Sequence, residues 1–352
     1  MRVDPPVIDD DLDRASLVAA IDRDLEAATR IRSLSCPPPE LSRALGNLRE
    51  AASLPETDLG DFVRTHFEFY RSAGREGGTL FTGYFEPILE GRRRPGGSFA
   101  YPLYRRPGDL IEIRLGDFSG EWQGTTIYGR VAGGQLVPYY TRREIDGDRA
   151  LDDRGLELAW LDDPVARYFL QVQGSGILRL EDGTDLHVGF AGSNGRPYTS
   201  IGRLLVDDGS LSAGQATAPA IAAFLRAHPE RRDDILFRNE RYVFFRMVDD
   251  GPIGRLGVKL TAGRSIAVDV SLYPLGALAY VETEAPLVDS AGQPSGRRPL
   301  RRLVLAQDTG AAIAGPGRVD LFFGSGDAAG LEAGTMSSRG ELYFVVPREC
   351  AR

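Results

Sequence analysis

Three aspartates in the C-terminal third of the chain stand in or beside apolar runs. Asp308 follows the run 303–306, Asp320 lies inside the run 319–323, and Asp269 lies in the alternating stretch RSIAVDVS. A buried carboxylate is costly unless it is paired or hydrogen-bonded. A single such aspartate most often caps a turn or bonds to backbone amides. Three are harder to explain in this way. If the strands meet, repulsion and desolvation would raise at least one pKa, as a general acid requires.

Other short motifs suggest chemistry that their context does not support. DTGA at 308–311 matches the aspartic protease motif, but that chemistry needs two carboxylates sharing a proton, and no second D-[ST]-G occurs. A protease would therefore need a homodimer. GSGDAA at 324–329 resembles a dinucleotide-binding loop, but too little chain follows for the required helix, strand and ribose-binding acid. QGSG at 173–176 precedes the strand-like ILRL, which favours a turn or a close approach to a ligand.

Composition limits the class of protein. A length of 352 residues favours two domains, and a net charge of −8 argues against nucleic acid as a partner. Two cysteines exclude a four-cysteine zinc site and the three histidines are scattered, so no metal is expected. A disulfide between Cys36 and Cys350 is compatible with the sequence but cannot be deduced from it. No apolar stretch is long enough to span a bilayer, and the first residues lack the apolar core of a signal peptide. Either the protein stays inside the cell or an export segment is missing from this chain.

Apolar periodicity and turn residues indicate a mostly β chain that begins with helices. Ser16 is expected to cap the first helix, and Ser200 to cap a helix that Gly209 ends. Strand-like runs in the middle region include TTIYGRV, ARYFLQVQ and ILRLEDG, and β signals return from Tyr242 onward. The expected helices cover 16–30, 40–52, 57–72, 199–209 and 217–227.

The aspartate segments and several others, in order, resemble the membrane-bound lytic murein transglycosylase A family, whose C-terminal part is the three-aspartate 3D domain. The resemblance covers roughly residues 80–347. It rests on FTGYFEP (81–87), YPLYRRP (101–107), FLQVQGSG (169–176), AGSNGRPYTSIGRLLVDDG (191–209), RYVFFR (241–246), AVDVSLYPLG (267–276), AQDTGAAIAGPGRVDLFFGSGDAAG (306–330) and GELYFVVP (340–347).

The resemblance implies a mostly β fold with N-terminal helices. A double-psi β-barrel domain would be made from 1–86 and 249–352. A second, smaller β domain would be inserted at 87–248, with a groove between the two. The independent pattern of helices, a β middle and a β C-terminal region agrees with this expectation.

The resemblance also implies cleavage of the β-1,4 bond between N-acetylmuramic acid and N-acetylglucosamine in peptidoglycan, with the muramoyl 6-hydroxyl as nucleophile and a 1,6-anhydro end as product. Ordinary glycosidases need two carboxylates, whereas an intramolecular nucleophile removes the need for the second. The family's acid/base position maps to Asp320. Asp308 and Asp269 complete the expected catalytic set as support for Asp320.

Family motifs also mark expected sugar contacts, although Tyr84 would equally suit a core position. No metal or organic cofactor is implied. The expected partners are peptidoglycan glycan strands and a cell-wall remodelling complex, with the protein a monomer in the cell envelope, in the periplasm or at the outer membrane. The rival interpretations are a non-catalytic glycan-binding protein and a dimeric aspartic protease that uses Asp308. The sugar contacts that the family motifs mark are Thr82, Tyr84, Gln173, Ser175 and Asn194.

Overall fold

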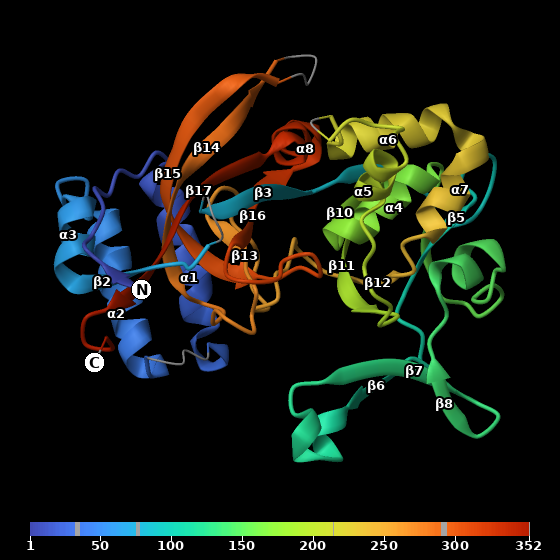
Figure 1. Ribbon diagram of the computed structural model, residues 1–352, viewed down its shortest axis with the longest axis horizontal. Helices are drawn as coiled ribbons and strands as arrows, with labels where there is room; N and C mark the ends of the chain where they lie inside the picture. Colours follow the sequence, from blue (N-terminus) through green and yellow to red (C-terminus); the bar gives the residue numbers. More distant parts are fainter. Residues whose placement is uncertain (32–35, 75–77, 214, 290–293, 352) are drawn as a thin grey trace. The chain divides into compact units, whose positions relative to one another are not determined.

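The computed structural model describes residues 1–352 except 32–35, 75–77, 214, 290–293 and 352. The chain divides into two compact units (Figure 1). Met1–Glu86 and Pro252–Arg352 together form the first, which we call the barrel unit. The intervening Pro87–Gly251 forms the second, which we call the inserted unit.

Six strands of the barrel unit close into a barrel in the order β17–β14–β15–β13–β16–β3, because β3 also pairs with β17. The pairs β13–β15 and β16–β3 are parallel. Alternate side chains fill the interior, among them Phe81, Ile266, Val319 and Leu342. The predicted mostly β fold with N-terminal helices is confirmed. The strands are β1 Arg2–Val3, β2 Phe67–Arg71, β3 Thr79–Glu86, β13 Ser265–Ala267, β14 Leu278–Val288, β15 Pro294–Asp308, β16 Arg318–Ser325 and β17 Ser337–Pro347.

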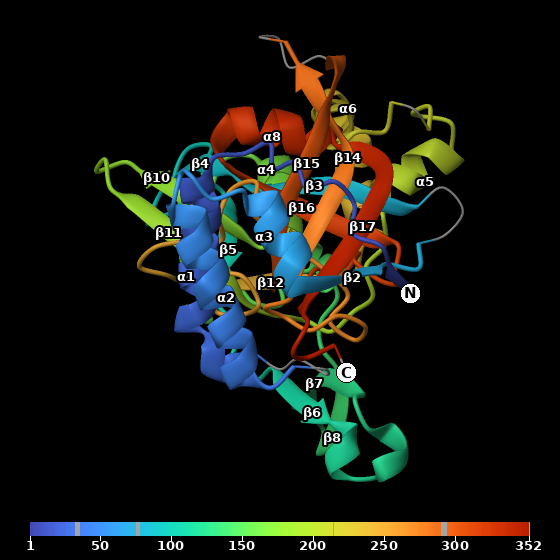
Figure 2. The ribbon, with the colours of Figure 1, turned by 90° about the vertical axis from the view of Figure 1, so that its left-hand side faces the viewer.

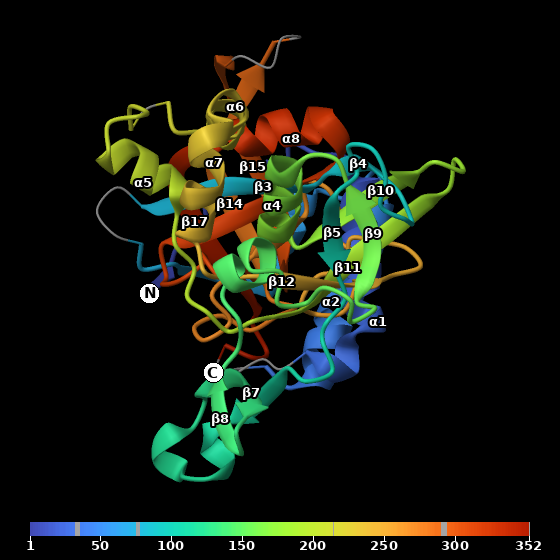
Figure 3. The ribbon, with the colours of Figure 1, turned by 90° about the vertical axis from the view of Figure 1, so that its right-hand side faces the viewer.

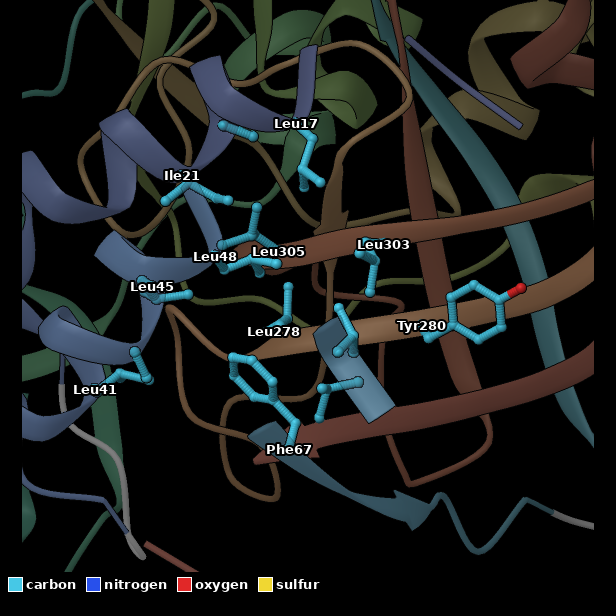
Figure 4. Close-up of a cluster of buried hydrophobic side chains, with 14 of the residues drawn as sticks. Leu17, Ile21, Leu41, Leu45, Leu48, Phe67, Leu278, Tyr280, Leu303 and Leu305 are labelled. Atoms are coloured by element: carbon cyan, nitrogen blue, oxygen red, sulfur yellow. The ribbon is translucent and has the colours of Figure 1, made fainter. Parts of the chain in front are cut away.

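The N-terminal helices pack against the outside of the barrel (Figure 2) through a second apolar cluster. Leu17 and Ile21 of α1 and Leu45 of α2 pack with Leu303 and Leu305 of β15 (Figure 4). All five side chains are fully buried, and burying one leucine completely is worth roughly 2 kcal/mol. The cluster therefore fixes α1 firmly against β15. The helices of this unit are α1 Arg14–Glu26, α2 Pro38–Ser53, α3 Leu59–His66 and α8 Gly326–Thr335, with a 3₁₀ turn at Ala28–Arg30.

The first and third predicted helices differ most from the sequence-based expectation. α1 starts two residues earlier than expected, and the Asp13 side chain caps it by accepting a hydrogen bond from the Ser16 amide. The helix expected over 57–72 ends at His66, and Phe67–Arg71 forms β2. Fully and partly buried residues alternate along β2, and its pairing with β1 and β17 outweighs helix propensity.

Helix α8 was not expected from the sequence, and it packs closely on β3. A Cβ atom at Gly83 would lie 2.7 Å from Ala333 Cα, so a residue without a side chain allows this approach. The helix thus supports the part of β3 that carries Thr82 and Tyr84.

A disulfide joins Cys36 and Cys350, whose Cα atoms are 4.8 Å apart although the residues are 314 positions apart in sequence. Cys36 precedes α2 and Cys350 follows β17. The bond therefore ties the two ends of the barrel unit together. The pairing that the sequence left open is present.

The inserted unit contains a four-stranded sheet in the order β12–β11–β10–β4, a β5–β9 pair, a three-stranded β6–β7–β8 sheet and four helices (Figure 3). Its strands are β4 Ile88–Gly91, β5 Tyr101–Tyr104, β6 Ile111–Arg114, β7 Thr126–Ala132, β8 Gln135–Pro138, β9 Glu157–Leu161, β10 Ser175–Leu180, β11 Asp185–Ser193 and β12 Val243–Met247. Its helices are α4 Pro164–Gln173, α5 Ile201–Asp207, α6 Ala218–Ala227 and α7 Pro229–Phe237, with short helical turns at Leu115–Asp117, Gly120–Trp122 and Arg143–Gly147.

The run ARYFLQVQ, expected as a strand, is the body of helix α4. Asp163 caps this helix by accepting a hydrogen bond from the Val165 amide, and Pro164 occupies its first turn. Gly174, with a φ of 83°, ends it. These start and stop signals outweigh the β propensity of the aromatic and branched residues between them. By contrast, the expected Ser200 cap is confirmed on α5. No helix in the described parts of the chain is long and apolar enough to cross a membrane.

Candidate active site

Residues that pair across successive strands of the barrel bring two of the three aspartates together. Ala267 of β13 pairs with Asp308 of β15 on one side and with Asp320 of β16 on the other. Asp320 in turn pairs with Thr82 of β3. Residues directly opposite each other on neighbouring strands project from the same face. The two carboxylates and the threonine hydroxyl therefore share one face, and the small Ala267 side chain separates the acids.

A β-bulge turns Asp308 onto this face. Ile266 pairs with Ala306 but Ala267 pairs with Asp308, so Gln307 is an extra residue in β15. Ala306 belongs to the interior cluster, and simple alternation would direct Asp308 inward as well. The extra residue reverses that direction, as bulges beside active sites often do.

Asp308 is held by backbone amides. Its Oδ1 accepts a hydrogen bond of 2.9 Å from the Arg255 amide. Burial raises the pKa of Asp308 to about 6, and the nearby Asp320 adds to the rise, while hydrogen bonds from the Thr309 and Arg255 amides and from Tyr84 oppose it. The amide donors favour the charged form of Asp308, as Arg318 favours that of Asp320.

Asp320 lies in a different environment from Asp308. Burial raises the pKa of Asp320 to about 6, and only Arg318 opposes this, with Nη2 3.4 Å from Oδ1. The side chain keeps 20% of its surface exposed, so a ligand can reach it. Oδ1 has no hydrogen bond to any described residue. Oδ1 is buried and faces Arg318, so the exposed surface belongs to the rest of the side chain. Asp320 is therefore a partly exposed carboxyl that remains partly protonated near neutral pH.

Two hydroxyl groups of β3 lie beside the acids. The Thr82 and Tyr84 hydroxyl oxygens are buried, and neither makes a hydrogen bond of good geometry within the described part of the chain, although Tyr84 lies close to Asp308. Burial first, and then the two carboxylates, raise the pKa of Tyr84 well above its ordinary value. Its ring packs against Phe322, with centroids 5.3 Å apart. Both are thus neutral, buried hydroxyls close to the two acids.

Asp269 does not lie in a strand, contrary to expectation, because β13 ends at Ala267. Its carboxylate accepts hydrogen bonds from the Gly315 amide at 2.7 Å and the Ser271 amide at 2.9 Å. Bonds from Ser271 and Gly315 lower the pKa of Asp269. Its visible task is to anchor the loop that connects β15 to β16.

The remaining predicted contacts belong to the inserted unit. Asn194 is 1% exposed, and its amide is fully used by neighbouring backbone: it donates to the Tyr140 and Glu240 carbonyls and accepts from the Arg196 and Tyr242 amides. The visible task of Asn194 is therefore to hold neighbouring backbone, and its expected contact with a sugar stays a prediction. Gln173 and Ser175 flank Gly174 where α4 ends and β10 begins, and both are partly exposed.

Sequence reasoning missed Arg318 and Gln307. Arg318 stands two residues before Asp320 on the same strand, which was a usable signal for a shared face. Gln307 precedes Asp308, but the sequence gives no local sign that a bulge lies there. Among the described residues, no group of three or more His, Cys, Asp or Glu side chains is arranged to hold a metal ion.

Comparison with known proteins assigns the chain to a family. Residues 80–246 match the model of the MltA specific insert domain, and residues 264–346 match that of the 3D domain. A crystal structure of a membrane-bound lytic murein transglycosylase from Agrobacterium tumefaciens is 32% identical, with a TM-score of 0.83, and the match covers 96% of this chain and 94% of that one. The chain belongs to the membrane-bound lytic murein transglycosylase A (MltA) family.

Other MltA proteins agree with this assignment. The membrane-bound lytic murein transglycosylase A of Vibrio cholerae is 32% identical over 272 residues, which are 76% of this chain and 66% of the relative. The chain thus spans about two thirds of that relative's length. A structure of E. coli MltA with bound chitohexaose is 25% identical, with a TM-score of 0.77 and coverage of 98% and 93%.

Proposed function

We propose that this protein is a lytic transglycosylase of peptidoglycan that cleaves the β-1,4 bond between N-acetylmuramic acid and N-acetylglucosamine and leaves 1,6-anhydro ends. The observation that carries the proposal is Asp320, a partly exposed carboxyl with a raised pKa, beside a second acid held by amides. Membership of the MltA family and the chitohexaose bound to the E. coli relative support a glycan substrate.

The chemistry needs one proton donor that becomes a proton acceptor. Protonated Asp320 donates to the glycosidic oxygen as the bond to the muramoyl anomeric carbon breaks. The muramoyl 6-hydroxyl attacks that carbon, and the Asp320 carboxylate then removes the hydroxyl proton. The proton count balances and no water is consumed. Because the nucleophile is part of the substrate, proximity replaces the second carboxylate of an ordinary glycosidase.

The surroundings of the two acids support this division of roles. Two neighbouring carboxyls do not ionise independently. Once one of them is charged, its negative charge makes the other carboxyl hold its proton more tightly. Amide donors stabilise the charge on Asp308, which leaves the shared proton for Asp320. Asp308 is thus proposed to keep Asp320 protonated before the reaction, and Asp269 to hold the loop between them in place.

Further parts of the proposal concern the rest of the molecule. We infer that 1–86 with 249–352 form the catalytic domain and that the inserted domain, 87–248, adds sugar contacts through Gln173 and Ser175. Thr82 and Tyr84 are proposed to donate hydrogen bonds to sugar oxygens next to the cleaved bond. The protein would act as a monomer in the cell envelope, at the periplasm or outer membrane, alone or within a wall-remodelling complex.

Mass spectrometry of peptidoglycan treated with the purified protein, before and after borohydride reduction, tests the proposal. Products one water lighter than hydrolysed muropeptides and resistant to reduction are expected, because a 1,6-anhydro end has no free aldehyde. Reducible products would indicate a hydrolase in which Asp308 activates water. Intact glycan with retained binding would favour the non-catalytic glycan-binding protein. Cleavage of peptide only, abolished by Asp308→Asn, would favour the dimeric protease.

A further inference from the structure

A buried polar network lies directly behind the bulge that carries Asp308. Gln307 on β15 and Asp24 on α1 are both fully buried. The Gln307 Nε2 donates to Asp24 Oδ1 at 2.6 Å and to the Ala20 carbonyl at 3.1 Å. On the other side, the Ser265 hydroxyl donates to Gln307 Oε1 at 2.5 Å. The amide of Gln307 is therefore fixed from both ends, between helix α1 and strand β13.

The backbone of the bulge is fixed as well. The Gln307 carbonyl accepts a hydrogen bond of 3.0 Å from the Leu256 amide. The amide of the preceding residue, Arg255, donates to the Asp308 carboxylate. A Cβ atom at Gly254 would lie 2.5 Å from the Gln307 carbonyl oxygen, so glycine is needed for this segment to approach. One tripeptide thus contacts both the bulged residue and the acid that follows it.

The presence of a carboxyl group at Asp24 requires an explanation, because a leucine would suit the surrounding apolar cluster better. Its Oδ2 makes no hydrogen bond to any described residue. Burial raises the pKa of Asp24 to about 7, and the bond from Gln307 opposes the rise. Asp24 supplies an acceptor for the Gln307 amide, and the Ala20 carbonyl is the other acceptor for it among the residues that the structure describes.

We propose that Gln307, oriented by Asp24, is a positioning residue that fixes the β15 bulge and so holds Asp308 on the face that carries Asp320. Without these anchors β15 can slip by one residue, and a slip of one residue directs a side chain to the opposite face. The inference rests on the proposed function, because it concerns the acid that controls the proton on Asp320.

The variants Gln307→Met, Asp24→Leu and Asp24→Asn test this inference. Gln307→Met keeps the length of the side chain but removes its hydrogen bonds. We expect kcat on peptidoglycan to fall at least tenfold with KM nearly unchanged, since misplacement of a catalytic group by about 1 Å can cost about 100-fold. Asp24→Leu should lower kcat in the same way, because it removes the acceptor for the Gln307 amide. Asp24→Asn keeps an acceptor oxygen for Gln307 and should retain most of the activity.

The pH profile separates positioning from a general loss of stability. When Asp308 leaves the face, its charge no longer disfavours ionisation of Asp320. The basic limb of the kcat profile should therefore move to lower pH in Gln307→Met. Gln171 provides a matched control, since it is a buried glutamine of the inserted unit at 3% exposure. Gln171→Met is expected to leave the profile of kcat against pH unchanged.

The result that overturns the inference is a folded Gln307→Met enzyme with the kcat and pH profile of the wild type. If Gln307→Met does not fold, Ser265→Ala removes only one of the anchoring bonds and is expected to lower kcat several-fold. An unchanged kcat in folded Ser265→Ala would then overturn it. Wild-type protein is assayed first for 1,6-anhydro products. Absence of those products refutes the proposed function, whereas active wild type with equally active variants refutes only the role of Gln307.

Discussion

The buried carboxyl of Asp24 should make the stability of the barrel unit depend on pH. Its pKa in the folded protein is about 7, against an ordinary value of 3.8, because it is buried. The folded state therefore binds the proton more tightly than the unfolded state. The contribution of Asp24 to the free energy of unfolding should be most favourable below its ordinary pKa of 3.8. That contribution should decline as the pH rises toward its folded-state pKa of about 7. Asp24→Asn removes the ionisation and should remove this part of the decline.

The magnitude follows from the pKa shift. Each pKa unit is worth about 1.4 kcal/mol, so the full shift amounts to about 4 kcal/mol of destabilisation above pH 7. At pH 5 roughly a third of this is already present, because the unfolded carboxyl is ionised there. Between pH 5 and pH 8 the wild type should lose about 3 kcal/mol relative to Asp24→Asn. For a domain of this size, that corresponds to a melting-temperature difference of roughly 5–10 °C.

Thermal denaturation of both proteins at several pH values between 5 and 8 measures this difference. Asp22 on the same helix is the matched control, because its carboxylate is exposed and paired with Arg49 at 2.7 Å. Asp22→Asn should follow the wild-type curve. Parallel curves for wild type and Asp24→Asn would refute the reasoning, since they would mean that Asp24 ionises alike in the folded and unfolded states.

Three further substitutions give distinct outcomes. Arg318→Met removes the cation that opposes the raised pKa of Asp320; the basic limb of the kcat profile should move to higher pH, and an unmoved limb would contradict this. Replacing Cys36 and Cys350 with alanine should lower the unfolding free energy, measured by urea denaturation, by about 2–5 kcal/mol. Equal urea midpoints for the variant and the wild type would show that the disulfide contributes nothing to stability. Asp269→Ala removes the anchor of the β15–β16 loop and should cost about 1–3 kcal/mol of stability while glycan binding in a pull-down assay persists; loss of binding without loss of stability would assign Asp269 to the substrate.

The sequence predicted those elements whose signals are local. The apolar period of α1 and the Ser200 cap of α5 each depend on residues within a few positions, and both elements are present. Residues 164–173 contain aromatic and branched side chains that suit a strand or a helix equally well. Only the cap at Asp163 and the stop at Gly174 distinguish a helix from a strand here.

The site could be predicted only in part, because its geometry depends on contacts between distant residues. The positions of Asp308 and Asp320 in apolar runs predicted that both lie on strands, although not that β13 lies between these strands. The bulge could not be predicted, because the side chain that fixes Gln307 is 283 residues away. The alternation around Asp269 predicts a strand, yet its bond from the Ser271 amide makes a turn just after β13 ends.

Turnover and glycan binding by Asp320→Asn test the central claim most directly. Asparagine has the shape of the carboxyl but can neither donate the proton nor take it back. The account predicts unchanged binding of glycan strands and a kcat lower by about 10²–10⁴-fold, with Asp308→Asn, the matched variant of the neighbouring acid, retaining measurable 1,6-anhydro product. Near-normal turnover by Asp320→Asn, or loss of turnover only in Asp308→Asn, would contradict a mechanism in which Asp320 is the acid and the base.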